Sequence, residues 1–501
     1  PTLLAGEQQC GCGRSQKRVR RMRAITLATF LMAAWLGAAQ AQPESPSRAP
    51  LLLEEVLSSS AQHYPQILES LAKRRAASGK VLEADGAFDL VFEADAYDRV
   101  SGFWSGGVLN TQVRRPLRPL GAEVYGGYRI SDGRFPIYED EYFTNAGGEF
   151  KIGALFSLLR DRSIDERRFK TTDARLALQQ AELEILLTQV GVQHKAIVAY
   201  LRWVWAGRQL AVYEDLLRIA RDRQGGLQEQ VRSGARARIF LTENLQNISR
   251  RERLAMEAQR DFLSAANNLS LYYRDGAGRP LVPDAAQLPP TAILLEAEEI
   301  AKIDGDEIPA VLAQRPELQI LRTGLERARQ RAALSKNELQ PRLDLTTEVS
   351  RDVGAIAEGG ASRDSTDTIV GLRFTLPLQR REARGRLRQA EAEVEAMRQR
   401  RRQLEDQIEI ELRNIIIDLD ASTRLVTIAD QEVGQSETMR EAERERFESG
   451  ASDFFLVNVR EETAADARIR YYLAALQTRI AQANYHAATL NLNQLGIDPA
   501  R

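Results

Sequence analysis

Three histidines are the side chains of this chain best suited to bind a metal ion or to transfer protons near neutral pH. His63, His194 and His486 lie in separate segments, and none has a second ligand at the spacing of a metal site. The sequence also lacks a glycine-rich phosphate loop and a nucleophile turn with partner residues. The adjacent carboxylates at residues 298–299 and 461–462 stand in charged helical runs, where we expect solvation. We therefore expect neither an enzyme nor a protein that holds a cofactor or a metal ion.

The first 41 residues have the pattern of a secretory signal peptide after a short upstream extension. A basic segment at residues 17–23 precedes an apolar run at residues 24–36, and residues 39–41 form an Ala-Gln-Ala cleavage site. The apolar run is too short for a membrane anchor. We expect translation to start at Met22 and cleavage to follow Ala41.

Cleavage changes the charge and removes the cysteines. The whole chain has 69 Lys and Arg against 70 Asp and Glu. The first 41 residues take six of the basic residues and one of the acidic residues, so the mature chain is acidic. That charge argues against nucleic acid as a partner. Both cysteines, Cys10 and Cys12, are also lost, so packing or oligomerisation must stabilise the exported protein.

The mature chain contains two halves with similar segments in the same order. The clearest pair is Ser233-Gly234-Ala235 and Ser449-Gly450-Ala451. Three further pairs are residues 156–159 with 374–378, residues 63–68 with 314–321, and residues 88–90 with 343–345. This order predicts a tandem duplication. We place the first copy at residues 42–273, a Pro/Gly-rich linker at 274–295 and the second copy at 296–496.

Each copy should contain a helix, alternating strands, a long helix and a returning helix. Pro65 and Pro316 suit the first turn of the opening helices. Apolar and polar residues alternate in strands within residues 88–156 and 342–376. The first copy has extra strand-like segments at 107–117 and 121–131. These could extend the sheet, cap it from outside or replace the expected pairing.

The helical hairpins are expected at residues 163–273 and 380–496. A proline-free run of about 70 residues would span roughly 100 Å as a helix. Apolar residues follow a heptad spacing, which predicts coiled-coil packing: Leu176, Leu183, Val190 and Ile197, then Leu387, Ala390, Val394, Met397, Leu404 and Ile408. Gly234 and Gly450 suit left-handed turns at the hairpin tips, and Ser452 or Asp453 could cap the second returning helix.

Short alternating strands in an exported chain suit a membrane β-barrel, although a soluble β-sandwich has a similar pattern. Aromatic residues near the strand ends could form an interfacial girdle: Tyr97, Phe103, Trp104, Tyr125, Tyr128, Tyr142 and Phe143. Two strands in each copy are too few to close a barrel, so several subunits would have to contribute strands to one barrel. The second copy has Pro377 where its strand turns into its helix. The first copy lacks a proline there, which leaves its bend unexplained.

These features together, with the turn sequence ESGASDFFL at residues 448–456, resemble the TolC-like outer-membrane efflux proteins (outer membrane factors). The resemblance covers residues 50–496. It implies a mainly α fold with a membrane β-barrel portion, a tandem repeat, and coiled-coil hairpins that form an α-barrel in a homotrimer. It also implies that the protein lies in the outer membrane of a Gram-negative bacterium and has a large periplasmic part. As the charge already indicated, we expect no nucleic acid among its partners.

The function that the resemblance implies is an exit duct of a tripartite efflux or type I secretion system. Its partners would be a periplasmic adaptor protein, an inner-membrane pump of the RND or ABC type, and outer-membrane lipid. The alternatives are a periplasmic adaptor, which usually has a single hairpin, and a structural coiled-coil scaffold without a pore. The substrate cannot be inferred, because pumps select it.

The resemblance also points to sites near the hairpin tips. Acidic residues often narrow the family's tunnel there, and a ring of carboxylates would act strongly on passing ions. The candidates for this constriction are Asp453, Asn458, Glu461 and Glu243; each could instead be a solvated or capping residue. The candidates for the hairpin tips and adaptor contact are Gly234, Arg236, Arg238, Gly450 and Ser452.

Overall fold

The fold is described from a computed structural model, which describes residues 49–136, 143–296, 300, 303, 305–357 and 365–498. The expected signal peptide, Cys10, Cys12, Tyr142 and residues 298–299 lie outside these ranges. None of the described helices has an apolar run long enough to cross a membrane.

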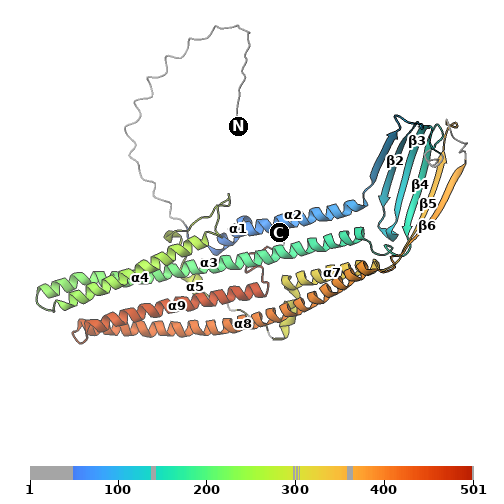
Figure 1. Ribbon diagram of the computed structural model, residues 1–501. Coiled ribbons are helices and arrows are strands. Elements are labelled where there is room, and N and C mark those ends of the chain that lie inside the picture. The colour runs from blue at the N-terminus through green and yellow to red at the C-terminus, as the bar shows by residue number, and fades with distance from the viewer. Residues whose placement is uncertain are drawn as a thin grey trace, which may run out of the picture. The chain divides into compact units, whose positions relative to one another are not determined.

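Two very long helices dominate the structure (Figure 1). α3 (Glu166–Arg232) has 67 residues and α8 (Arg381–Glu448) has 68, so each is about 100 Å long. The other helices are α1 (Leu53–His63), α2 (Pro65–Asp85), α4 (Ile239–Leu269), α5 (Ala292–Leu295), α6 (Ile308–Gln314), α7 (Pro316–Asn337) and α9 (Phe454–Ala488). As predicted, Pro65 and Pro316 begin α2 and α7.

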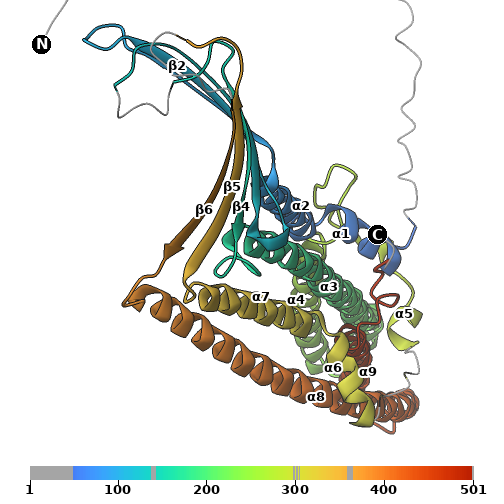
Figure 2. The ribbon, with the colours of Figure 1, turned by 90° about the vertical axis from the view of Figure 1, so that its right-hand side faces the viewer.

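The long helices pack with two sets of shorter ones. Near the hairpin tips the contacts follow the order α4, α3, α9 and α8, and nearer the strands they follow α2, α3, α7 and α8. Figure 2 shows α2, α3, α7 and α8 below the strands. Each row has an outer helix at either end. These are α4 and α8 in the first row and α2 and α8 in the second, and each contacts only one helix of its own row.

The main hydrophobic core surrounds the middle of α3. Trp203 and Tyr200 are fully buried there, and the Tyr200 hydroxyl donates a 2.8 Å hydrogen bond to the carbonyl oxygen of Leu51. Two of the predicted heptad positions, Val190 and Ile197, belong to this core. In α8 the predicted positions Ala390, Val394 and Ile408 are buried as well. The heptad prediction therefore identified residues that do face neighbouring helices.

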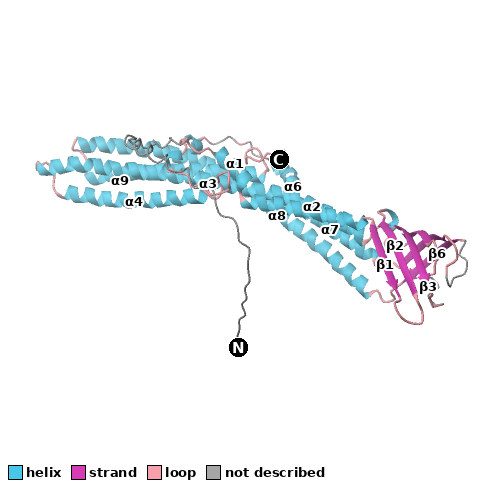
Figure 3. Cartoon of the chain, turned by 90° about the horizontal axis from the view of Figure 1, so that it is seen from above, coloured by secondary structure: helices cyan, strands magenta, loops and turns pink. Residues whose placement is uncertain are grey.

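In the described part of the chain, six strands form one antiparallel sheet in the order in which they occur in the sequence (Figure 3). They are β1 (Val91–Asp98), β2 (Gly106–Pro116), β3 (Glu123–Gly133), β4 (Glu149–Ser157), β5 (Arg342–Asp352) and β6 (Thr366–Thr375). The extra segments of the first half, β2 and β3, extend the sheet between β1 and β4; they do not cap it. The first strand starts at Val91, later than the expected residue 88, because residues 86–88 form a short 3-10 helix.

The register gives the sheet one apolar face and one polar face. One row across the sheet joins Phe92, Val113, Gly126, Ile152 and Val349. On the opposite face, Arg129 is paired with Glu149, and the Tyr125 hydroxyl donates to Glu348 at 2.6 Å. The apolar side chains are open to the surroundings, since Phe92 is 65% and Ile152 is 67% exposed. The alternation expected from the sequence is therefore present.

The bend between β4 and α3 is held without a proline. Asp161 adopts a left-handed backbone with φ 70°. Its N–H donates to Oδ1 of Asn337 at 3.1 Å, and Nδ2 of Asn337 donates to its carboxylate at 2.9 Å. Asn337 is the last residue of α7, so the second half fixes the bend of the first. The second half itself bends at Arg380, which is also left-handed with φ 49°.

The same bend requires a glycine in the β2–β3 turn. Gly121 has φ 55°, and a Cβ atom there would lie 2.3 Å from the carbonyl oxygen of Asp161. Asp165 then begins α3, because its carboxylate accepts a 2.8 Å hydrogen bond from the backbone N–H of Arg168. Sheet, turn and long helix are thus joined by specific polar contacts.

Candidate tunnel-tip site

Both hairpin tips turn at a left-handed glycine, as predicted. Gly234 has φ 77° and Gly450 has φ 78°. In the first tip the N–H of Gly234 donates to Val231 and the N–H of Ala235 donates to Gln230. This is the Schellman pattern, which satisfies the last carbonyl groups of a helix. The second tip repeats it after α8.

The predicted capping of α9 is wrong. Asp453 occupies the N-cap position, but its side chain accepts no hydrogen bond from the helix. The Ser452 hydroxyl instead donates to the Glu443 carboxylate. Glu443 is only 3% exposed, and a buried carboxylate without a partner would be costly. The Ser452 hydroxyl therefore bonds a side chain of α8 and does not cap the first turn of α9.

Aromatic rings join the two tips. Phe454 is fully buried, and its ring lies 5.8 Å from that of Phe447 and 6.1 Å from that of Phe240. The guanidinium of Arg236 lies 4.2 Å from the ring centroid of Phe447 and 5.5 Å from that of Phe240. Arg236 is therefore held by cation–π contacts within the same chain, whereas Arg238 is exposed.

A buried ion cluster lies one to two turns further along α9. Arg251 of α4 has a fully buried side chain and donates to Glu461 at 2.9 Å and to the Leu216 carbonyl oxygen at 2.9 Å. Arg223 of α3 donates to Glu461 as well, and to Oδ1 of Asn458 at 3.0 Å. Burial lowers the pKa of the Arg251 guanidinium, and the Glu461 carboxylate opposes this shift.

The buried ion cluster includes two of the candidate constriction residues, Asn458 and Glu461. Asn458 and Glu461 are 4% and 5% exposed, and they contact arginines of α3 and α4. Within the chain they connect the two hairpins and present no free charge at a surface. The arginines were missed because they lie in other helices. One signal was available: Arg251 stands seven residues after Asn244 and seven before Ala258, and all three are buried.

The other two candidates lie close together. Burial raises the pKa of Glu243, and the nearby Asp453 carboxylate raises it further, while the neighbouring Asn458 side chain opposes the shift. The start of α4 and the start of α9 thus bring two carboxylates together beside the tips. Asp453 is exposed and Glu243 is half-buried. Their role in a constriction stays a prediction.

The histidines show no sign of a metal site in the part of the chain that the structure describes. Within it, no group of three or more His, Cys, Asp or Glu side chains could hold a metal ion. Nε2 of His194 lies 2.6 Å from Oδ1 of Asn484, a contact that links α3 to α9.

The chain combines two long helical hairpins with an antiparallel sheet that has one apolar face, the combination expected from the resemblance to outer-membrane efflux proteins. Residues 308–489 match the family model described as outer membrane efflux protein. No curated protein matches the chain. The resemblance to the TolC-like proteins that the sequence suggested is thereby confirmed.

Solved structures of this class share the fold. The outer membrane protein VceC of Vibrio cholerae aligns with a TM-score of 0.61 at 15% identity, over 87% of this chain and 95% of that one. The MtrE outer membrane channel of Neisseria gonorrhoeae aligns with a TM-score of 0.62 at 13% identity, over 89% of each chain. The CmeC outer membrane channel of Campylobacter jejuni gives 0.60 at 12% identity, over 89% and 90%. At such identities the likeness concerns the fold.

Proposed function

We propose that three copies of this chain form the exit duct of a tripartite efflux system. The duct carries substrates from an inner-membrane pump, through an adaptor and a periplasmic tunnel, across the outer membrane of a Gram-negative bacterium. The observation that carries the proposal is the two-faced sheet at one end of the long helical hairpins. An apolar face suits lipid and a polar face suits a water-filled passage.

The sheet has edges that a second copy can cover. Among the described strands, β1 and β6 each pair on one side only, and both are largely exposed. Unpaired strand edges in a membrane are costly, so closure between subunits is favoured. Three six-stranded sheets reach the size at which barrels of roughly 16–18 strands leave an aqueous channel.

The outer helices also offer apolar contacts to a second copy. On α8, Ile410 and Ile417 are 60% and 63% exposed and lie seven residues apart. On α4, Met256 and Leu263 are 66% and 54% exposed and are also seven residues apart. Each pair forms a stripe along one helix face. Packing α8 of one copy against α4 of the next would close a ring of helices.

The tip features complete the proposal. Asp453 and Glu243, repeated three times, would form an acidic ring near the entrance and favour cations. The exposed turns around Gly234, Arg238 and Gly450 would contact the adaptor. The matching order of helix, strands, long helix and returning helix supports a tandem duplication in which the first copy gained β2 and β3.

Cysteine cross-linking tests the assembly directly, because the mature chain contains no cysteine. Single cysteines in β1 and in β6, combined in one chain and treated with a short bifunctional maleimide, should give a trimer ladder in the outer-membrane fraction. Cysteines placed in the central strand β3 serve as the control and should give none. Recovery of the protein as a soluble periplasmic monomer would overturn the proposal and favour an adaptor or a scaffold.

A further inference from the structure

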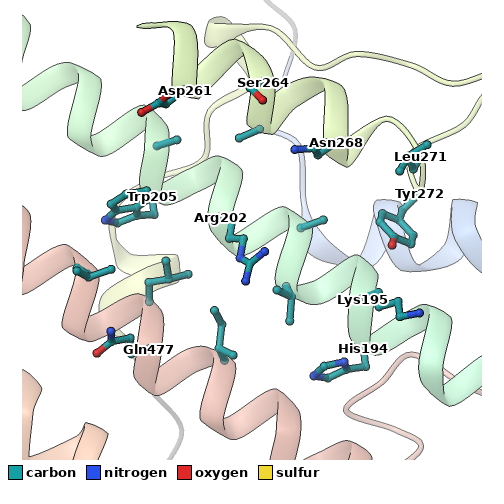
Figure 4. Close-up of a pocket in the computed structure, with 17 residues that line it drawn as sticks. His194, Lys195, Arg202, Trp205, Asp261, Ser264, Asn268, Leu271, Tyr272 and Gln477 are labelled. Carbon is teal, nitrogen blue, oxygen red and sulfur yellow. The ribbon is translucent and has the colours of Figure 1, made fainter. Parts of the chain in front are cut away.

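A cavity of about 760 Å³ lies between α3, α4 and α9 (Figure 4). Its α3 residues end at Ala206, several helical turns before Arg223 of the buried ion cluster. Its volume falls within the range of roughly 300–1,000 Å³ typical of sites for small organic molecules. The contacts at the hairpin tips described above do not use its side chains.

Two exposed cations that line this cavity have no partner among the residues that the structure describes. Lys195 and Arg202 stand seven residues apart and therefore share one face of α3. Neither makes an ion pair or a side-chain hydrogen bond with any residue in the described ranges. The carboxylate that also lines the cavity, Asp261, accepts hydrogen bonds of 2.9 and 2.7 Å from Arg260. The cavity therefore has an excess of positive charge.

The rest of the lining is largely apolar. Ala199 and Ala206 on α3, together with Leu476 and Ile480 on α9, leave room between the helices. Tyr272 closes one end, and it is fixed by stacking on Tyr64 with a centroid distance of 5.3 Å and an interplanar angle of 12°. Such a wall removes an organic body from water, which a small inorganic anion would not exploit.

We infer that this cavity binds an organic anion: an aromatic or branched apolar body that carries one carboxylate or sulfonate. The body lies against the alanines and the α9 side chains, and the acid group faces Arg202. The Arg202 guanidinium points into the space between α3 and α9 (Figure 4) and can recognise an oxyanion of this kind through charge-assisted hydrogen bonds, while Lys195, two turns away on α3, adds positive charge at the rim. A cation of the same shape would be repelled. Binding does not require a membrane or a pump, so its test is independent of the exit-duct proposal.

The test is ligand-observed ¹⁹F NMR on the purified full-length protein in a nonionic detergent. The probe is 4-(trifluoromethyl)benzenesulfonate, and the comparison is a trimethylammonium compound with the same aromatic body. The anion should show saturable line broadening that weakens as salt rises, and the cation should show none. Equal broadening by both would mean partition into the micelle and would overturn the inference.

Matched variants locate the site. Lys195→Gln with Arg202→Gln should weaken anion binding roughly tenfold or more, because both unpaired positive charges of the cavity are lost. Lys195→Arg with Arg202→Lys should preserve it. Arg75→Gln with Lys80→Gln on α2 removes the same charge from exposed positions and should leave binding unchanged.

A substitution that fills the cavity distinguishes binding inside it from general electrostatic attraction of the anion to the protein surface. Ala199→Phe keeps both cations and fills the apolar wall, so it should abolish binding while circular dichroism stays that of the parent protein. Binding that survives this variant, or that survives loss of both cations, refutes the site.

Discussion

Removal of the Glu461 carboxylate tests the role assigned to the buried ion cluster. Glu461→Gln keeps the size of the side chain but removes the carboxylate that pairs with both arginines, so that Arg251 keeps as its ion pair the longer contact of 3.9 Å between its Nε and the Glu462 carboxylate. Arg251 has a side chain that is 0% exposed and cannot reach water, whereas that of Arg223 is 19% exposed and can be partly rehydrated. Breaking a buried pair in this way costs about 3–5 kcal/mol. We expect the lower part of that range, because the Glu462 carboxylate still lies 3.9 Å from the buried Arg251 guanidinium.

Two further substitutions set the scale. Arg223→Gln leaves Glu461 bonded to Arg251, so its cost should be nearer the about 1–3 kcal/mol of a lost hydrogen bond to a charged group. Glu257→Gln breaks the Arg253–Glu257 pair on α4, whose side chains are 59% and 47% exposed. Exposed pairs of this kind contribute about 0.2–1 kcal/mol. The expected order of destabilisation is Glu461→Gln, then Arg223→Gln, then Glu257→Gln.

Hydrogen–deuterium exchange read by mass spectrometry is the suitable assay, since the cluster joins local elements. Peptides from α4 and from the first turns of α9 should lose protection in Glu461→Gln, while peptides from α2 and α7 should keep it. An effect of Glu461→Gln no larger than that of Glu257→Gln would refute the reasoning. A uniform loss of protection across the chain would instead mean that the variant misfolds.

Three further outcomes are expected. Asp453→Lys with Glu243→Lys should reduce cation preference in planar bilayers, and unchanged preference would exclude both residues from the constriction. The pKa of Glu243 is raised, so its charge destabilises the tip above the ordinary pKa of 4.5 and not below it; Glu243→Gln should raise the thermal midpoint at pH 7 and have little effect near pH 4. Gly121→Ala should destabilise the protein by more than about 1 kcal/mol in thermal unfolding, because its Cβ would meet Asp161. Asn337→Ala, which loosens the same bend, serves as its comparison.

Local features of the sequence were sufficient to predict much of the fold. Proline at a first helical turn, glycine at a helix end and the periods of heptads and strands act within a few residues. Pro65, Gly234 and Gly450 therefore stand where they were expected. The two faces of β4 also followed from alternation alone.

Features that depend on distant partners could not be predicted in this way. Glu461 resembled a solvated or tunnel-lining carboxylate until Arg251, 210 residues earlier in the chain, was seen to bond it. Ser452 has the right type for a helix cap, but the buried Glu443 competes for its hydroxyl. The position of β2 and β3 between β1 and β4 depends on which strand edges pair. The spacing of residues in the sequence does not determine that pairing.

The contact between Asp161 and Asn337 has a consequence for the order in which the chain folds. These residues are 176 positions apart, and Ser157 in β4 is paired with Asp344 in β5, 187 positions further on. Helical hairpins close through local contacts, but contacts of such separation form slowly because a long loop must first be ordered. An exported chain would therefore pass through a stage in which α3 and α4 are paired while the apolar face and outer edge of β4 are open. Until β5 arrives, β4 is the segment most in need of a chaperone in the periplasm.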